Sequence, residues 1–371
     1  MFFNIGKSNL IVFVIMYFKP RYIKMACALQ SMDYRLCFIM EDNEINRGIQ
    51  KEIPKGIQIR YFKSAEEALD ICRKYTPLVF HIFVEKEYET AYFLIKNKKE
   101  IGKIIYSEYD LFWGYYKNAA KKSAERAVAK ERYCFENADG ICFRDWGGEF
   151  LEKNSDYNIQ GKWIMLLDGC AGTQIDRSRK KLHGLHLCYV GSVCVGKQSG
   201  IYSHNEELML LIERCEKEHV HVHIYPNRKN SGIYASYISM SKNMKYFHFH
   251  NSLPYSQLIG QISHYDYGID ISLKPYEEAI ETYTKAAYRY DSGNKYFDYL
   301  DAELPLIAPC TELLAEEFER RGVCIRENLL TVDFNYLKAE KTKYREAVIQ
   351  AKADFDMRKN ITKLIDLYKN C

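Results

Sequence analysis

A lysine stands near the start of a short amphipathic segment in the second half of the chain, residues 291–309 (DSGNKYFDYLDAELPLIAP). Turn residues precede Asn294, which can cap a helix, and apolar side chains then recur at i, i+3 and i+7. A helix N-terminus presents unpaired N–H groups and partial positive charge, so it suits a diphosphate, and Lys295 adds a full charge. One turn later, Asp298 can accept hydrogen bonds from ribose hydroxyls. The alternative is a solvated helix face with a Lys/Asp pair at i, i+3.

Charged side chains also follow the apolar runs of the first half of the chain. Lys19 and Arg21 come after the first run, Glu85 after the fourth, and Glu108 and Asp110 after the fifth. Carboxylates at strand ends can bind an acceptor hydroxyl or act as a catalytic base. They also serve as ordinary loop or capping acids, and the sequence leaves both interpretations open.

Histidines alternate at His219, His221 and His223, which places them on one face of an expected strand. Three ligands along a single extended strand cannot converge at about 2.1 Å on one tetrahedral ion without help. We therefore expect structural histidines and no metal site. The same expectation holds for the pairs His248/His250 and His183/His186.

The elements that position these residues alternate between β-branched or aromatic runs and helical stretches, which is typical of βα units and a mostly parallel sheet. A polar stretch over residues 168–183 separates two such series. We predict an α/β protein with two doubly wound domains, in which ligands bind beyond the C-terminal strand ends. The expected strands are 10–16, 35–40, 57–62, 78–84, 103–107, 140–144, 163–167, 187–190, 221–225, 246–250, 267–273 and 306–308.

Composition sets broad limits on the function. The 371 residues carry a formal charge of +4, which gives no case for a nucleic-acid binder. The 12 cysteines are scattered singly, so we expect free thiols in a reducing cytoplasm. The apolar run 10–18 is too short to span a bilayer and lacks a cleavage site after it, and we interpret it as a buried first strand.

The segment 294–305 resembles the donor-site helix of family 4 glycosyltransferases with the GT-B fold, which reads NK-x-F-E-Y-L-A-x-G-x-P. The matching residues are Asn294, Lys295, Phe297, Asp298, Tyr299, Leu300 and Pro305. Segments upstream agree in order: 189–191 resembles the strand and glycine that open the family's C-terminal domain, 253–258 (LPYSQL) its V-P-Y-x-E-L, and 263–270 (SHYDYGID) its A-D-x-G-L.

The resemblance implies which residues bind the nucleotide sugar. Asp298 stands where the family has Glu, Ser192 where many members have Arg, and Asp301 and Glu303 where it has a small residue and a glycine. Because of Ser192, we expect the diphosphate to depend on Lys197, Lys295 and Arg289. The donor residues that the resemblance implies are Gly191, Ser192, Ser252, Leu253, Arg289, Asn294, Lys295 and Asp298.

The predicted domains are 1–168, an N-terminal acceptor domain; 169–183, a linker; 184–350, a nucleotide-sugar domain; and 351–371, a helix crossing back to the first domain. The apolar stripe of this last helix, Ile361, Leu364, Ile365 and Tyr368, is expected to pack against another part of the protein. Lys197, Lys295, Glu108 and Asp110 are the candidate catalytic residues, and Lys19, Arg21 and Glu85 lie on the acceptor side.

The implied activity is transfer of a sugar from a nucleoside diphosphate sugar to an acceptor hydroxyl in cell-surface polysaccharide or glycolipid assembly, with configuration retained and no metal or other cofactor. The expected partners are a nucleotide sugar and a carbohydrate or lipid-linked acceptor, without nucleic acid. The alternatives are a nucleotide-sugar epimerase, a periplasmic-type binding protein, against which the free cysteines and the crossing helix weigh, or a silent GT-B scaffold.

Two surface features stay open. Residues 276–290 look helical and form either a mobile lid bearing Arg289 or an insertion far from the ligand. The basic stretch Lys117, Lys121, Lys122, Arg126, Lys130 and Arg132 fits contact with the inner membrane face or a solvated helix face.

Overall fold

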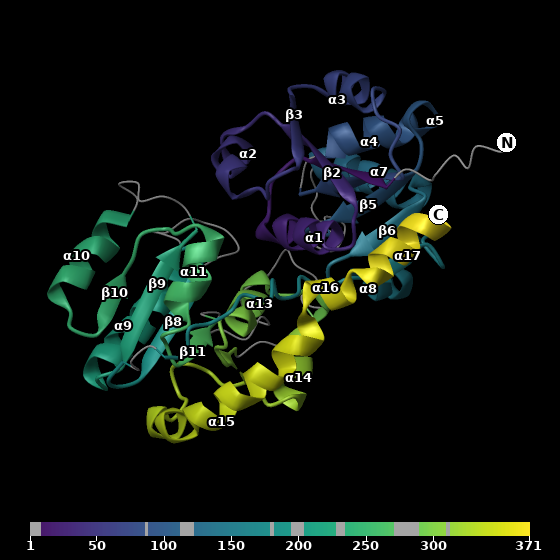
Figure 1. Cartoon of the computed structure of the whole chain (residues 1–371). Coiled ribbons are helices and arrows are strands. Elements are labelled where there is room, and N and C mark those ends of the chain that lie inside the picture. The colour runs from purple at the N-terminus through teal and green to yellow at the C-terminus, as the bar shows by residue number, and fades with distance from the viewer. Residues whose placement is uncertain are drawn as a thin grey trace. The chain divides into compact units, whose positions relative to one another are not determined.

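The computed structural model describes residues 9–85, 88–111, 122–178, 182–193, 204–227, 234–270, 289–308 and 312–371. It has two units, each with its own sheet (Figure 1). Unit 1 comprises the described residues up to Gly169, residues 289–292 and Met357–Cys371. Unit 2 comprises those between Cys170 and 270 and Gly293–Asp356. No described helix is long and apolar enough to cross a membrane.

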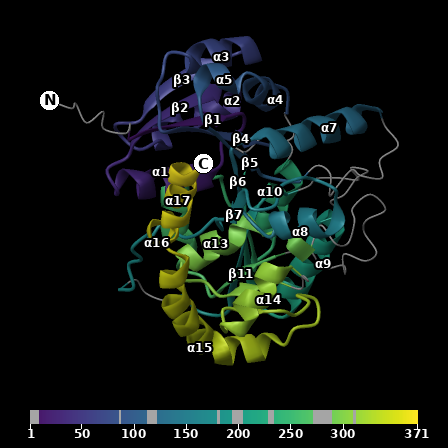
Figure 2. The same cartoon turned by 90° about the vertical axis from the view of Figure 1, so that its right-hand side faces the viewer.

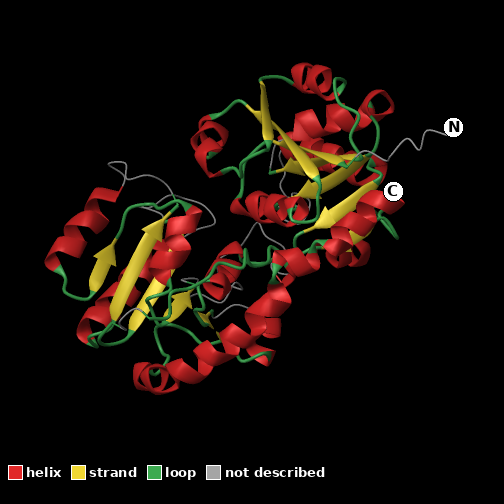
Figure 3. Cartoon of the chain, viewed as in Figure 1, coloured by secondary structure: helices red, strands yellow, loops and turns green. Residues whose placement is uncertain are grey.

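The strands of unit 1, which Figure 3 draws in yellow, form one sheet. It has seven parallel strands in the order β3-β2-β1-β4-β5-β6-β7. Strand order reverses at β1, which is the pattern of a doubly wound sheet. The central strands consist almost wholly of buried apolar residues, as expected where both faces are covered. The strands are β1 Leu10–Ile15, β2 Arg35–Glu41, β3 Gln58–Phe62, β4 Val79–Val84, β5 Ile104–Glu108, β6 Gly140–Phe143 and β7 Trp163–Met165.

Helices cover both faces of this sheet because side chains alternate along each strand. Val12 and Val14 pack with α3, α4, α7 and α8, whereas Ile11 and Phe13 pack with α1, α16 and α17. The helices of unit 1 are α1 Pro20–Gln30, α2 Glu44–Gly48, α3 Ala65–Cys72, α4 Tyr88–Lys96, α5 Lys98–Ile101, α7 Lys122–Asn137, α8 Gly147–Asn154, α16 Met357–Asn360 and α17 Thr362–Asn370.

The end of the chain returns to unit 1, where α17 packs beside β6 and β7 (Figure 2). The expected apolar stripe of this helix is buried against the sheet. A buried chain of hydrogen bonds also connects α17 to the sheet. Tyr368 OH lies 2.6 Å from His81 Nδ1, and His81 Nε2 lies 2.7 Å from Ser107 Oγ. Burial lowers the pKa of His81, so the ring is neutral and links helix to sheet.

Unit 2 has six parallel strands in the order β10-β9-β8-β11-β12-β13. Leu187 and Tyr189 pack toward α9, α10 and α15 on one face, and α13 contacts β11 from the other. The strands are β8 His186–Gly191, β9 His221–Pro226, β10 Phe247–Phe249, β11 Tyr267–Ile269, β12 Leu306–Ile307 and β13 Cys324–Ile325. The helices are α9 His204–Lys217, α10 Ala235–Asn243, α11 Tyr255–Ile262, α13 Asn294–Asp301, α14 Leu313–Arg320 and α15 Phe334–Lys352.

The limits of the units differ in detail from those expected. From Cys170 onward the polar stretch packs within unit 2, where the Cys170 N–H donates to Phe355 O at 2.7 Å. The return to unit 1 begins at Met357 rather than at residue 351. Residues 289–292 also belong to unit 1, so the chain returns to unit 1 immediately before α13. This return is absent from the sequence-based division.

Candidate functional site

Helix α13 has a fixed seat on the sheet of unit 2. Tyr299 OH donates to Ile269 O and accepts from Val190 N–H, both at 3.0 Å, which links the helix to β11 and β8. Gly268 provides the space, since an added Cβ would lie 2.2 Å from the Tyr299 ring. The N-terminus of the helix is therefore held near the C-terminal ends of β8 and β11.

Lys295 occupies the first turn of this helix, and Asp270 follows β11. The Lys295 amine lies 3.0 Å from one Asp270 oxygen, and Tyr296 OH donates to the other at 3.1 Å. The amine also lies 4.9 Å from the centre of the Tyr189 ring. The first turn carries no acidic residue, and Gly293 at its N-cap supplies no side-chain cap. These features make a cationic helix N-terminus that suits an anion.

The electrostatics keep this lysine charged. Burial acts to lower the pKa of Lys295, but the Asp270 carboxylate outweighs it and raises the pKa above its usual range. Asp270 is buried, whereas about a quarter of the Lys295 side chain, 23%, remains exposed. The Lys295 amine is thus oriented by the buried Asp270 carboxylate and remains accessible to a ligand.

The remaining expected donor residues lie mainly on neighbouring loops. Gly191, at the end of β8, has φ of +144°, which a side chain would disfavour. Ser192 Oγ accepts a hydrogen bond from Asn227 at 2.8 Å. Ser252 and Leu253 are half-buried between β10 and α11, and Asp298 is half-buried on α13. Asn294 is the first helical residue rather than the cap, and Lys197 lies outside the described residues.

The C-terminal end of α13 differs from the expectation at two acids. The i, i+3 spacing of residues 295, 298 and 301 predicts Asp301 on the polar helix face with Lys295, but its side chain is fully buried. Its carboxylate accepts from Thr173 Oγ1 at 2.6 Å and Tyr255 OH at 3.1 Å, and Lys352 Nζ lies 3.4 Å away. Asp301 is therefore a structural residue that fixes the 170–178 segment to the helix.

Because Glu303 stands where the family has a glycine, the sequence predicts that the end of this helix lacks a left-handed residue, and this prediction is wrong. Glu303 has φ of +60° in place of the family's glycine, and the N–H of Leu304 closes the turn onto Tyr299 O at 2.8 Å. An Arg177 guanidinium holds the Glu303 carboxylate through bonds of 2.7 and 3.0 Å. Both residues line a cavity of about 440 Å³ that includes neither Lys295 nor Asp270.

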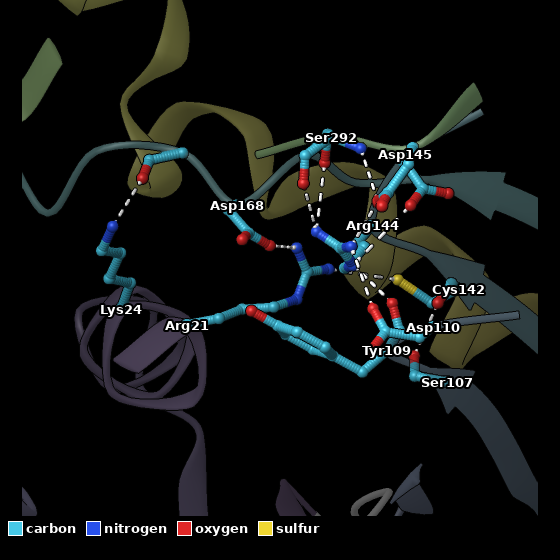
Figure 4. Close-up of polar contacts among 12 residues, drawn as sticks. Arg21, Lys24, Ser107, Tyr109, Asp110, Cys142, Arg144, Asp145, Asp168 and Ser292 are labelled. Carbon is cyan, nitrogen blue, oxygen red and sulfur yellow. Dashed lines mark hydrogen bonds and ion pairs between the residues drawn. The ribbon is translucent and has the colours of Figure 1, made fainter. Parts of the chain in front are cut away.

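In unit 1, charged and aromatic residues gather at the C-terminal ends of the strands (Figure 4). Lys19, directly before α1, pairs with Glu85 at 2.6 Å. The Tyr109 ring lies 4.4 Å from the Lys19 amine and 4.4 Å from the Arg144 guanidinium carbon. Lys19 and Glu85 are each about one-fifth exposed. This partly open edge presents both hydrogen-bond donors and carboxylate acceptors to a polar ligand.

Arg144 is the buried centre of this edge. Its guanidinium binds Asp291 at 2.5 Å, Ser292 O at 2.6 Å and Asp110 at 3.4 Å, and its Nε lies 3.6 Å from Asp145. Burial acts to lower the pKa of Arg144, but the acids around it, Asp291 first, raise it well above its usual value. Arg144 thereby anchors the chain immediately before Gly293, where α13 is about to begin.

Two candidate residues of unit 1 are directed inward. Arg21 was expected on the loop after β1, but it is buried in α1, and Asp168 binds it at 2.6 Å. Glu108 was expected at the ligand edge, but only 5% of it is exposed, and Tyr88 and Tyr106 donate to its carboxylate. Burial raises the pKa of Glu108 well above its usual range. Neither side chain is available to a ligand at this edge.

The structure describes Arg289 but not most of the lid segment proposed from the sequence. Most of the lid segment, residues 276–288, lies outside the described residues. Arg289 is exposed and belongs to unit 1, whereas Lys295 belongs to unit 2. Next to it, Tyr290 O accepts from the Trp146 N–H at 3.2 Å, and the Tyr290 ring packs 5.5 Å from Phe150.

Sequence reasoning missed Asp270, Tyr109, Arg144 and Asp291. Arg144 ends an expected strand and Tyr109 follows the fifth one, so a systematic survey of polar residues at strand ends would have found both. Asp270 lies inside the expected strand 267–273, and it follows a strand end only because the observed strand stops at Ile269. Asp291 was interpreted only as part of a turn. Its bond to Arg144 joins residues 147 positions apart, which no local pattern indicates.

Solved structures match nearly the whole chain. A glycosyltransferase from Rickettsia africae ESF-5 is 12% identical, with a TM-score of 0.67 and 98% of each chain covered. Sucrose-phosphate synthase from Thermosynechococcus elongatus is 11% identical, with a TM-score of 0.67 over 97% of this chain and 98% of that one. The chain has the GT-B fold.

The same fold also occurs in enzymes of another class. UDP-GlcNAc 2-epimerase from Neisseria meningitidis, solved with UDP-GlcNAc, is 11% identical with a TM-score of 0.57, covering 96% of this chain and 99% of that one. No protein-family model and no curated protein sequence matches the chain. Function must therefore be argued from the site.

Proposed function

We propose that the protein transfers a sugar from a nucleoside diphosphate sugar to an acceptor hydroxyl. The observation that carries this proposal is the cationic N-terminus of α13, where Lys295 is oriented by Asp270 at the strand ends of a doubly wound sheet. Helix N–H groups and a fixed lysine can neutralise the charge that develops on a leaving diphosphate. The glycosyltransferases among the matching structures support this assignment.

The proposed reaction resembles that of family 4, with retained configuration and no metal in the chemistry. The glycosidic bond to the diphosphate breaks, the acceptor oxygen bonds to the same sugar carbon, and the acceptor proton passes to the leaving diphosphate. Asp298 would bind the ribose, and the edge of Lys19, Glu85 and Asp110 would bind the acceptor. A cell-surface polysaccharide or glycolipid is the proposed product class.

Lys295→Ala tests the donor site directly. Removing one preorganised donor to developing charge typically costs about 3–4 kcal/mol, so we expect kcat to fall by about 100- to 1000-fold. Nucleotide release is measured with a panel of nucleoside diphosphate sugars and simple sugar acceptors. The control is Lys343→Ala, since this exposed α15 lysine pairs with its helix neighbour Glu340 and lies outside the site. An unchanged kcat in Lys295→Ala would refute the assigned role.

The second candidate is a nucleotide-sugar epimerase, which the matching UDP-GlcNAc 2-epimerase supports. An epimerase converts the nucleotide sugar without an acceptor, whereas a transferase releases nucleotide when the acceptor is added. Incubation with the nucleotide sugar alone, followed by NMR of the sugar, separates the two. A protein that does neither with any nucleotide sugar is a silent scaffold.

The basic stretch on α7 bears on the proposed contact with the inner membrane face. Lys130 pairs with Glu89, and Arg132 pairs with Glu136 at 2.9 Å and Asp156 at 3.0 Å. Lys117, Lys121 and the side chain of Lys122 lie outside the described part of the chain. Because acids pair with two of these cations, the solvated helix face is the better-supported interpretation.

A further inference from the structure

Imidazole rings from neighbouring strands of unit 2 come together on one sheet face. His186 lies on β8, His221 and His223 on β9, and His248 and His250 on or beside β10. The parallel register pairs His186 with His221 and His223 with His248, which brings these positions side by side. Among the described residues, His186, His221 and His223 each offer a nitrogen, and these nitrogens lie within 4.8 Å of one another.

Each of these three rings is oriented through its other nitrogen. His186 Nε2 lies 2.9 Å from His183 O, His221 Nδ1 lies 2.9 Å from His248 Nε2, and His223 Nδ1 lies 3.0 Å from His250 Nε2. Histidine ligands of metals characteristically have their outer nitrogen hydrogen-bonded in this way, which fixes the tautomer and the ring. The nitrogens left for a common ligand are His186 Nδ1 and the Nε2 atoms of His221 and His223.

We propose that His186, His221 and His223 form a Zn²⁺ site that clips β8 to β9, with water as the fourth ligand. Imidazole nitrogens are preferred by zinc and other late first-row divalent ions, whereas magnesium prefers oxygen. Zinc sites with three histidine ligands and a water in the fourth position are known. The site is independent of the proposed sugar transfer, because none of its residues belongs to the α13 site.

Two of the three ligand nitrogens already lie close together, and the third must move. His186 Nδ1 and His223 Nε2 are 2.9 Å apart, and two nitrogens of a tetrahedral zinc site are separated by about 3.4 Å, given Zn–N bonds of about 2.1 Å. The His221 ring stacks on His186 at 4.2 Å and 3°. Its Nε2 can be aimed at the ion only if the ring rotates about its Cβ–Cγ bond and gives up the hydrogen bond of its Nδ1 to His248. His186 and His223 are therefore already placed as two of the four ligands. His221 is only partly buried and is the side chain that moves.

The protons balance without a net release. In the metal-free chain His183 O can only accept, so His186 Nε2 carries its hydrogen and His186 Nδ1 accepts from His223 Nε2. When zinc binds His223 Nε2, that proton is carried on Nδ1 and is donated to His250 Nε2, and the proton of His250 moves to its own Nδ1. His250 thus acts as a positioning residue for the site.

Zinc titration of the full chain tests the proposal. After removal of metal by a chelator and desalting, calorimetry with ZnCl₂ should show one equivalent bound, and MgCl₂ should show none. X-ray absorption should give three nitrogen neighbours at about 2.0–2.1 Å. Cobalt substitution should give the intense visible absorption of a tetrahedral site. Absence of binding, or an oxygen-only shell, would overturn the proposal.

Variants locate the site. His221→Gln removes the half-exposed ligand, and we expect it to weaken zinc binding by more than about 100-fold, while His250→Gln should weaken it by about 10- to 100-fold as an outer partner. The control is His219→Asn, an exposed residue outside the triad whose φ of +55° asparagine tolerates. Circular dichroism checks that each variant is folded. Equal affinity in His221→Gln and the wild type would show that zinc binds elsewhere.

Discussion

At the residue scale, ion pairs decide which charges serve a ligand and which serve the fold. Asp270 orients Lys295, which stays partly exposed, whereas Asp168 pairs with an Arg21 side chain that is only 4% exposed. Asp145 is a third case, because it lies beside Arg144 and accepts from the Gly147 N–H at 2.8 Å. All three acids are buried, so their roles differ according to whether the paired cation stays accessible to a ligand.

Asp145 gives a prediction on pH. Burial raises the pKa of this carboxyl to about 7, even though Arg144 acts to lower it. The unfolded chain has a pKa of about 3.9 at this side chain, so ionisation favours unfolding: the stabilising contribution of the neutral acid is complete below about pH 4 and is lost as the pH rises toward about 7. Asp145→Asn removes this titration and keeps an acceptor for Gly147.

The measurement is the difference in Tm between Asp145→Asn and the wild type across this range. We expect the variant to gain Tm relative to the wild type as the pH rises from about 4 to about 7, and the difference to level off above that. A difference that stays constant with pH would show that Asp145 is ionised in the folded protein throughout.

At the element scale, α13 is positioned by the side chains that it packs against the sheet, and its charged residues do not set its place. Tyr299 reaches across to β8 and β11, Gly268 makes room for its ring, and Glu303 closes the helix in a left-handed conformation that costs roughly 1–2 kcal/mol for a residue other than glycine. The buried Asp301 and its partners oppose that cost by tying the helix end to neighbouring segments.

Gly268→Ala tests the seat of α13. The new Cβ would overlap the Tyr299 ring, so we expect a loss of about 1–3 kcal/mol in the free energy of unfolding and weaker donor binding as Lys295 is displaced. Gly260→Ala is the matched control: this α11 glycine has open space around it, and alanine should stabilise the helix by up to about 1 kcal/mol. Denaturant unfolding and nucleotide titration measure both effects. Equal stability of the two variants would contradict the close contact.

At the scale of the whole molecule, the described chain passes between the units more than once. It leaves unit 1 after Gly169, enters unit 2 again at Gly293 from an Arg144-bound segment, and returns to unit 1 at Met357. The closing helices then cover the face of the unit 1 sheet formed by Ile11 and Phe13. Unit 1 therefore depends on residues from the far end of the sequence.

Deletion of Met357–Cys371 should destabilise unit 1 selectively. Burying each large apolar side chain contributes about 1.5–3 kcal/mol, and Ile361, Leu364, Ile365 and Tyr368 would all be removed from the core. We expect aggregation or a lower Tm, measured by calorimetry and light scattering. Lys363→Ala with Asp366→Ala is the control, because both side chains lie on the exposed face of α17. A truncated chain as stable as the wild type would show that this helix is dispensable.

The sequence by itself determined the features that arise from local pattern. Alternating apolar runs predicted the α/β class with two parallel sheets, and the i, i+3, i+7 spacing predicted the helix at Lys295, because periodicity and capping act between residues close in the chain. The resemblance around that helix indicated the GT-B fold, which the solved structures confirm.

Tertiary structure alone decided how side chains from distant segments meet. The bond of Arg144 to Asp291, the inward turn of Glu108 and Arg21, and the meeting of His186 with His221 and His223 all depend on strand order and burial. Three histidines on one strand cannot converge, but a histidine on the neighbouring parallel strand can join two of them. Adjacent strands lie about 4.8 Å apart, and the register places His186 beside His221. A local sequence pattern does not show which strands become neighbours in the sheet. The order of the strands therefore decides which distant side chains meet.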